Sequence, residues 1–228
     1  MQKFEVTNDE ADIFSRANGR KLFLDVLGFK DPGKKAPGMP AYSPNWQSAK
    51  DYCVWLEHYT GLSFDLPTEA QCEYAARSLG QHFLYATDNG RIERGRNYQR
   101  EFGPGIDKVG LYPPNPLGLH DMMGNMMEWT NDWYERDYYT RSPEHNPQGG
   151  EPVRYYPSDP VLKIARGGSA YDAPDYNTTL KRMDRDPDKR KHARNGKAWF
   201  HWADFRCVLN LQEKLDATGL LRRVRRQK

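Results

Sequence analysis

The chain has 228 residues, enough for one large domain with a substantial core. Hydrophobic residues make up 37% of it and its mean hydropathy is −0.95. We expect no membrane span, because no apolar run reaches the roughly 18 residues that a transmembrane helix needs. The first residues, MQKFEVTNDE, lack a signal-peptide pattern. Because Met1 need not be the native start, both the cytoplasm and the cell envelope stay open.

The net charge of +3 has its source at the end of the chain. Without the five cations of the last eight residues, 29 cations remain against 31 acids. We therefore divide the chain into a domain at 1–210 and a basic tail at 211–228, and expect no nucleic-acid binding through the body of the domain. The five cations are Arg222, Arg223, Arg225, Arg226 and Lys228.

Helices are predicted in the first third of the chain, at 8–18, 46–59 and 69–79. Two of them begin with a capping pair, in which a threonine side chain and a glutamate or glutamine three residues later bond each other's backbone. These pairs are Thr7 with Glu10 and Thr68 with Gln71. The middle helix places four apolar residues on one face, namely Trp46, Ala49, Cys53 and Leu56.

The rest of the chain is rich in turn-forming residues. Four prolines make 30–45 an irregular connection, and from Gly80 onward Gly, Pro, Asn and Asp recur every few residues. Short strands are expected at 4–6, 163–166 and 205–209. Helices early in the chain and a loop-rich second half indicate an α+β fold.

Three cysteines are widely spaced, at Cys53, Cys72 and Cys207, and none forms a CxxC pair. This pattern predicts neither a zinc site nor a disulfide framework. Cys53 and Cys72 lie within apolar helical patterns, so we expect buried structural thiols there.

The stretch 119–134, LHDMMGNMMEWTNDWY, combines two acids with a turn signal. Asp121 and Glu128 flank the pair Gly124-Asn125. A loop of this kind can direct two carboxylates and backbone carbonyls at one point, which is how proteins hold calcium. The alternative is a polar turn before an aromatic core segment. Two tryptophans would anchor the loop, Trp129 and Trp133.

Six segments, in order, give the chain a resemblance to one family. They are FEVTN at 4–8, LPTEA continuing to EYAAR at 66–77, PPN with GL at 113–119, GNMMEW at 124–129, RGGS at 166–169 and FRC at 205–207. Together they resemble the formylglycine-generating enzyme (sulfatase-modifying factor) superfamily over residues 3–209. The resemblance implies a C-type-lectin-like single α+β domain with little regular secondary structure and with bound calcium.

The resemblance also implies which residues hold calcium. One site falls on the central stretch, where side chains of Asp121 and Glu128 would join the carbonyls of Gly124 and Met126. A second site begins with an asparagine and the carbonyl that follows it, and a later acid completes it. Its members here are Asn97, Tyr98 and Asp107.

The chain departs from the family where the oxidase chemistry resides. Family oxidases carry two cysteines, three and eight residues after the serine of GGS, and these thiolates bind copper because soft sulfur suits Cu(I). Counted from Ser169, the two positions hold Asp172 and Asn177. Met127 also replaces a family aromatic residue. Formylglycine generation is therefore not expected.

We expect the ligand face after Gly168, where polar, charged and aromatic residues gather. Asp172 and Asp175 would suit acid–base work there, although a solvated loop has the same composition. The segment 184–202, charged and then aromatic, is predicted to contact a partner or ligand. The candidate ligand-binding residues are Ser169, Asp172, Asp175, Tyr176, Asn177, Arg182, Arg185, Trp199 and Trp202.

Two classes of function follow from these residues. The first is a non-catalytic binding or scaffold module, stabilised by calcium and recognising a protein partner or a small ligand. The second is a metal-dependent oxidoreductase with non-heme iron or copper, for which His192 or His201 with Asp172 are the conceivable ligands. No histidine pair at helical spacing supports the second class, so the first is favoured.

Overall fold

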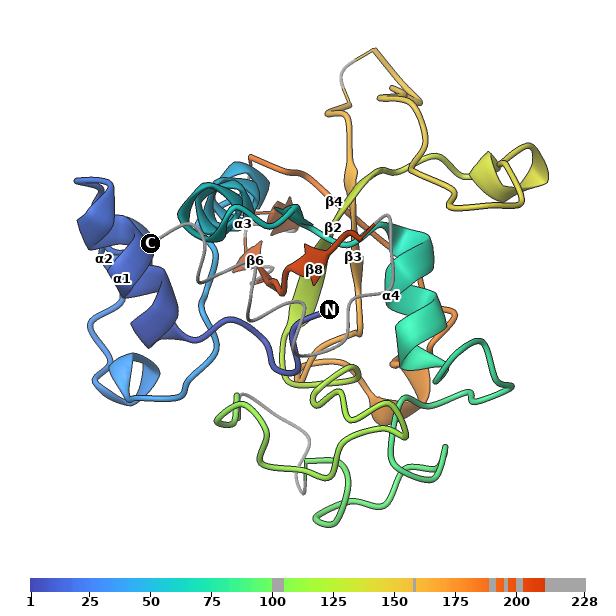
Figure 1. Cartoon of the computed structure of the whole chain (residues 1–228), viewed down its shortest axis with the longest axis horizontal. Coiled ribbons are helices and arrows are strands. Elements are labelled where there is room, and N and C mark those ends of the chain that lie inside the picture. The colour runs from blue at the N-terminus through green and yellow to red at the C-terminus, as the bar shows by residue number, and fades with distance from the viewer. Residues whose placement is uncertain (100–104, 158, 189–191, 195–196, 200–202, 212–228) are drawn as a thin grey trace.

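The computed structural model describes residues 1–99, 105–157, 159–188, 192–194, 197–199 and 203–211 (Figure 1). Four α-helices and three short 3-10 helices lie within them. The α-helices are α1 (Asn8–Ala17), α2 (Phe23–Leu27), α3 (Trp46–Thr60) and α4 (Glu69–Ala76). The 3-10 helices are η1 (Gly33–Lys35), η2 (Tyr138–Thr140) and η3 (Pro174–Tyr176).

Both predicted capping boxes are present, at the starts of α1 and α4. α3 ends at Gly61, whose φ of 65° is left-handed, as the sequence indicated. α4 is shorter than predicted, because the chain turns left-handed at Ser78 and Leu79 instead of continuing as a helix. The short helix α2 was not predicted, since five residues are too few to show a helical period.

The central sheet has four strands in the order β4-β3-β2-β7. β2 and β7 run parallel, with Glu128 opposite Asp204, whereas β3 is antiparallel to both β2 and β4. Two pairs stand apart, β1 with β8 and β5 with β6. The strands are β1 (Phe64–Asp65), β2 (Met127–Trp133), β3 (Lys163–Arg166), β4 (Met183–Arg185), β5 (His192–Arg194), β6 (Lys197–Trp199), β7 (Ala203–Asp204) and β8 (Val208–Leu209).

Three expectations about strands need correction or refinement. Glu128 and both tryptophans lie on β2, not on a loop. The strand predicted at 205–209 is shorter, because only Val208–Leu209 pairs with β1. Residues 4–6 form no regular strand, although Val6 N–H donates to the Phe205 carbonyl at 2.9 Å. The prediction at 163–166 is confirmed as β3.

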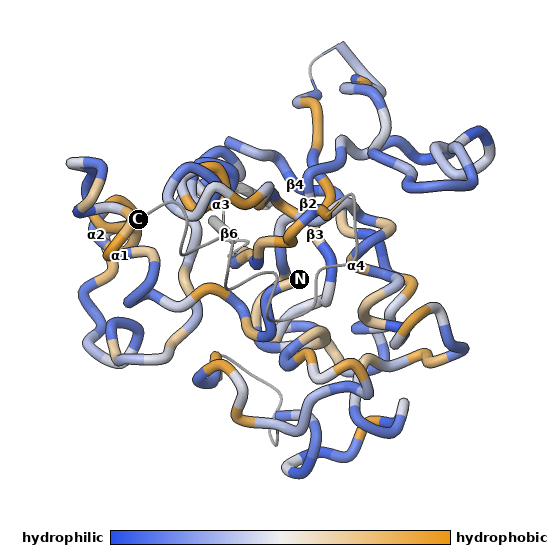
Figure 2. Tube along the Cα trace, viewed as in Figure 1, coloured by the Kyte–Doolittle hydropathy of each residue, from blue (hydrophilic) through white to orange (hydrophobic). Residues whose placement is uncertain are grey.

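Helices flank the central sheet on opposite sides (Figure 1), with α3 against β2 and α4 against both β2 and β3. The main core lies between α1, α3 and the strands, where apolar residues gather in Figure 2. Trp129 is buried there, and Trp133 stacks on Trp46. The Lys163 ammonium lies 3.8 Å from the centre of the Trp133 ring, a favourable cation–π contact. The tryptophans therefore anchor β2 as predicted.

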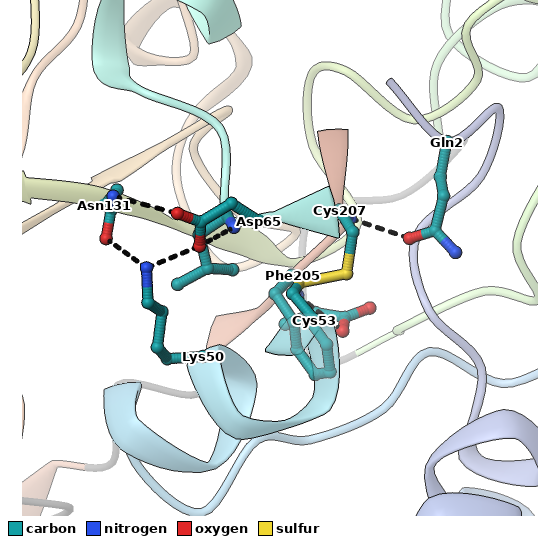
Figure 3. The surroundings of a disulfide bond; sticks show 9 residues. Gln2, Lys50, Cys53, Asp65, Asn131, Phe205 and Cys207 are labelled. Carbon is teal, nitrogen blue, oxygen red and sulfur yellow. Dashed lines mark hydrogen bonds and ion pairs between the residues drawn. A yellow bond between two sulfur atoms is a disulfide. The ribbon is translucent and has the colours of Figure 1, made fainter. Parts of the chain in front are cut away.

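A disulfide joins Cys53 on α3 to Cys207 (Figure 3), with their Cα atoms 5.7 Å apart. The expectation of a structural thiol at Cys53, and of no disulfide, was therefore wrong. The two residues are 154 apart in sequence, and only the packing of α3 against the last strand region brings them together. Cys72 is a buried free thiol, as expected. No helix within the described ranges is long and apolar enough to cross a membrane.

Candidate functional site

The Gly-Asn pair turns the backbone sharply before β2. Asp121, Gly124 and Asn125 have φ values of 56°, 82° and 47°, in the left-handed region that favours Gly, Asn and Asp. Packing also requires glycine at 124, because a Cβ there would lie 2.7 Å from the Tyr98 ring. The predicted turn is confirmed, and it leads directly into the strand that carries Glu128.

The Asn125 side chain ties three segments together. Its amide nitrogen donates to Glu5 Oε2 at 2.6 Å, and its amide oxygen accepts from Asp107 N–H at 3.0 Å. Glu5 also accepts from Met126 N–H at 3.2 Å. The N-terminal segment, the loop around Asp107 and the central turn are thus fixed relative to each other.

Glu128 is paired with a buried arginine. Arg206 donates from Nε and Nη2 to the two carboxylate oxygens of Glu128, each at 2.7 Å. Its guanidinium also donates to three backbone carbonyls, including that of His120 at 2.8 Å. Burial opposes the charge of Arg206, but the Glu128 carboxylate outweighs it and raises the pKa of Arg206. Both oxygens of the predicted calcium ligand Glu128 are therefore engaged by Arg206.

Carboxyl groups outnumber cations around this pair. Burial raises the pKa of Glu5 and of Asp204 well above the usual carboxyl range, and neighbouring carboxylates raise both further. Burial likewise raises the pKa of Asp121, against the hydrogen bond from Gly110 N–H. One oxygen of Asp204 is buried without a hydrogen-bond partner. This interior therefore favours either bound protons or additional positive charge.

A small polar cavity of about 20 Å³ lies beside the turn, large enough for one water or ion. It unites members of both predicted calcium sites, since Asn97, Tyr98, Asp107 and Asp121 all line it. Glu128, Gly124 and Met126 are not among its lining residues. The structure thus brings the first four together and leaves the other three outside the cavity.

The oxygen donors around this cavity fit a hard cation in part. Asp107 and Asp121 each carry a carboxylate, although Tyr112 O–H donates to the first at 2.9 Å and Gly110 N–H to the second at 2.6 Å. The Asn97 amide oxygen accepts from Glu93 N–H at 2.8 Å. Among the described residues, no three His, Cys, Asp or Glu side chains converge as a metal cluster. Calcium here would therefore depend on carbonyl and amide oxygens as well as on the two acids.

The GGS turn packs tightly around Asn177. Gly168 has a φ of 70°, and a Cβ there would lie 1.8 Å from the Asn177 amide oxygen. Asn177 is fully buried and donates to Tyr98 O–H at 2.8 Å and to the Ser169 carbonyl at 2.9 Å. Asn177 therefore holds the turn from inside rather than facing a ligand. Ser169 is buried as well.

The outer part of the same region is accessible. Tyr176 is 67% exposed and Tyr171 is 44% exposed, while Asp172 is half-buried and Asp175 exposed. One Asp172 oxygen has no hydrogen bond and lies 3.7 Å from Lys181 Nζ, a long ion pair. These side chains form an acidic and aromatic surface, which we call the 171–176 face.

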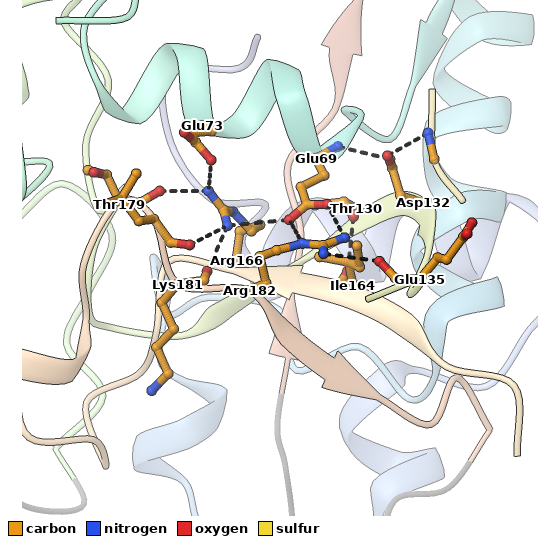
Figure 4. Close-up of polar contacts among 12 residues, drawn as sticks. Glu69, Glu73, Thr130, Asp132, Glu135, Ile164, Arg166, Thr179, Lys181 and Arg182 are labelled. Carbon is orange, nitrogen blue, oxygen red and sulfur yellow. Dashed lines mark hydrogen bonds and ion pairs between the residues drawn. The ribbon is translucent and has the colours of Figure 1, made fainter. Parts of the chain in front are cut away.

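Arg182, expected on the ligand face, belongs to an interior network (Figure 4). It donates to both oxygens of Glu69, at 2.7 and 3.0 Å, and lies between the rings of Tyr134 and Tyr139. Arg166 joins the same network through Glu69, at 3.4 Å, and also donates to Glu73 at 2.8 Å. These contacts hold α4 against β3, so the role of Arg182 in the structure is to join elements.

The remaining candidates lie on or beyond β4. Arg185 ends β4, and its side chain donates to the Asp184 carbonyl at 2.8 Å. Trp199 ends β6, whereas Trp202 lies outside the described residues. Within the segment 184–202, residues 189–191, 195–196 and 200–202 lie outside the described residues, so the partner contact expected there stays a prediction.

Sequence reasoning missed the roles of Glu69, Arg166 and Arg206. All three occur in the quoted segments LPTEA, RGGS and FRC, where they served only as marks of resemblance. Charged residues are rarely buried without a partner of opposite charge, so a lone charged residue within an apolar segment could have indicated a buried ion pair. Which acid meets which base follows only from the packing of α4, β2 and β3.

Comparisons with known proteins agree with this architecture. The model of the sulfatase-modifying factor enzyme 1-like domain matches residues 1–210. The chain is 37% identical over 132 residues to serine/threonine-protein kinase pkn1 of Chlamydia pneumoniae, covering 57% of this chain and 19% of the kinase. It is 30% identical over 185 residues to the formylglycine-generating enzyme of Streptomyces coelicolor, covering 72% of this chain and 55% of that enzyme.

Among solved structures, PvdO from Pseudomonas aeruginosa superimposes with a TM-score of 0.64 at 25% identity, covering 92% of this chain and 79% of PvdO. The chain spans between about a fifth and about half of the length of these curated relatives. The family match nevertheless extends over almost the whole chain. The chain therefore belongs to the family of sulfatase-modifying factor enzyme 1-like domains.

Proposed function

We propose that this chain is a non-catalytic binding module of its family. The observation that carries the proposal is the pair of side chains at the two thiol positions. Asp172 and Asn177 stand there, and neither can bind Cu(I) as a thiolate. Asn177 is moreover fully buried, with its amide bonded to Tyr98 and to the Ser169 carbonyl. The amide of Asn177 therefore serves to fix the turn around Ser169.

The surface best suited to binding is the 171–176 face. Exposed Tyr171 and Tyr176 offer large contact areas at low entropic cost, and Asp175 adds negative charge, while Lys181 lies near both Asp172 and the Tyr176 ring. Such a surface would recognise a protein partner or a small ligand with positive charge. The segment of pkn1 that is 37% identical to this chain makes up about a fifth of that protein, which is named as a kinase. This agrees with a domain that occurs as one part of larger proteins.

Calcium is proposed as a structural ion of this module. Asp107 and Asp121 would supply the charged oxygens at the small cavity, with Asn97 and the Tyr98 carbonyl beside them. A cation at this cavity would also lower the cost of burying the carboxyl groups of Glu5 and Asp204 in their charged form, whose pKa values burial raises. The ion would supply positive charge and hold the turn before β2, with no part in a reaction.

An activity assay tests the proposal. The purified chain, loaded with copper, is incubated with a sulfatase-type cysteine peptide, and the peptide is analysed by mass spectrometry. The formylglycine-generating enzyme of Streptomyces coelicolor serves as the positive control. We expect the aldehyde product with the control enzyme alone. Aldehyde formed by this chain would show that Asp172 and Asn177 do not prevent the reaction and would overturn the proposal.

A further inference from the structure

A surface cleft of about 790 Å³ lies between α4, the loop at 144–148 and the end of β8. Its volume is within the range of ligand sites, roughly 300–1,000 Å³. The cleft shares no residue with the 171–176 face or with the cavity beside the central turn. It is lined by Thr68, Ala70, Gln71, Tyr74, Glu144, Asn146, Pro147, Gln148, Leu209, Asn210 and Leu211.

One buried carboxylate ties two walls of the cleft together. Asp132 accepts from Glu69 N–H, in the first turn of α4, at 2.8 Å (Figure 4). Its other oxygen accepts from Gly149 N–H, directly after the loop, at 2.7 Å. Gly149 has a φ of 47°, and a Cβ there would lie 3.0 Å from Asp132 Cα. The separation of the two walls is therefore fixed by the fold before any ligand binds.

The third wall is oriented by a chain of amide hydrogen bonds. Gln71 accepts from Thr68 N–H at 2.9 Å within the capping box, which fixes its side chain. Its amide nitrogen then donates to Asn210 Oδ1 at 3.0 Å. Asn210 is held by its own backbone, whose N–H donates to the Ser63 carbonyl at 2.9 Å. Because its amide oxygen already accepts from Gln71, Asn210 presents its NH₂ group to the cleft as a donor.

The polar lining is made of amides, hydroxyls and one acid. Asn146 and Gln148 each offer both donors and acceptors, Asn210 offers the donors of its NH₂ group, and Glu144 adds an acceptor. Tyr74, which is 55% exposed, provides an aromatic face, and the remaining walls are aliphatic. No lysine or arginine is among the described residues that line the cleft, so an anionic ligand would meet Glu144 without a counter-charge from this part of the chain.

We propose that this cleft binds a neutral oligosaccharide. Paired donors and acceptors match sugar hydroxyl groups, and the aromatic and aliphatic surfaces match the apolar faces of sugar rings. An extended peptide fits less well, because strand addition needs a row of free backbone groups. β8 has only two residues, β1 already pairs with it, and Asn210 N–H is already bonded. The site is independent of the 171–176 face.

Binding to an array of oligosaccharides tests the proposal. The array carries neutral oligomers of glucose, galactose, mannose and N-acetylglucosamine, sialylated and sulfated glycans, and unstructured glycine-serine peptides. The neutral oligomer that gives the strongest signal is then titrated by calorimetry. We expect Tyr74→Ala and Asn210→Ala each to weaken binding about tenfold or more, as loss of one stacking or hydrogen-bond contact does.

Tyr59→Ala is the matched control, because Tyr59 is 70% exposed on α3, away from the cleft. It should bind like the parent, and circular dichroism should give all three variants the parent's melting temperature. The proposal is overturned if no neutral glycan binds, if the acidic glycans or peptides bind instead, or if the Tyr59→Ala variant loses as much affinity as the other two. None of these results depends on aldehyde formation, so this test and that of the proposed function are separable.

Discussion

Removing the disulfide should destabilise the chain by a large fraction of an ordinary domain's stability. Cys53 and Cys207 are 154 residues apart. In the chain-entropy description, closing a loop of this length stabilises the folded state by about 5 kcal/mol, because the unfolded chain loses conformational freedom. Domains of ordinary stability have a free energy of unfolding of about 5–15 kcal/mol. The Cys53→Ala/Cys207→Ala variant should therefore lose between about a third and all of such a domain's free energy of unfolding.

Urea denaturation of the oxidised parent, the parent in dithiothreitol and the double variant measures this loss. The reduced parent and the double variant should unfold at similarly low urea concentrations, and dithiothreitol should not affect the variant. Cys72→Ala is the control, since Cys72 is buried but unpaired and only its packing is lost. Alkylation of the denatured oxidised protein should label one thiol. Three labelled thiols, or a midpoint unaffected by dithiothreitol, would refute the reasoning.

Three further predictions concern the charged interior. Arg206→Met should lower the free energy of unfolding, measured by urea denaturation, by about 3–5 kcal/mol, because it leaves Glu128 buried and unpaired. Arg16→Met, at an exposed ion pair, should lower it by about 1 kcal/mol or less. Equal losses in the two variants would contradict this. Chelation by EDTA should lower the melting temperature of the parent but not that of Asp121→Ala, and an unchanged parent would count against calcium. Burial raises the pKa of Asp132 to about 6, above its ordinary value of 3.8, so the folded state binds this proton more tightly than the unfolded state. Stability relative to Asp132→Asn should therefore rise as pH falls from about 7 to 4, and a difference that is independent of pH would exclude the shift.

Local signals predicted the regular elements well. The capping pairs at Thr7 and Thr68 fixed two helix starts, and Gly61 fixed one helix end. These signals are readable because each involves residues within one turn of each other. The end of α4 was misplaced for a different reason. Ser78 and Leu79 adopt left-handed backbone conformations that their residue types do not favour, so tertiary packing overrides the local preference.

Interactions between distant residues escaped sequence reasoning. The spacing of Cys53 and Cys207 carries no mark of their pairing, since only the packing of α3 brings them together. The Glu128–Arg206 pair spans 78 residues, and the same glutamate alone suggested a calcium ligand. In contrast, the departure at Asp172 and Asn177 could be read directly, because residue identity there decides which chemistry is available.

Elemental mass spectrometry of the purified chain tests the central claim that this is a binding module rather than a metal-dependent oxidoreductase. The protein is expressed with calcium, iron and copper all supplied, and is then dialysed without chelator. We predict about one calcium per chain at most, held by the oxygen donors of the small cavity, and only traces of iron and copper. Iron or copper at one equivalent per chain would contradict the account.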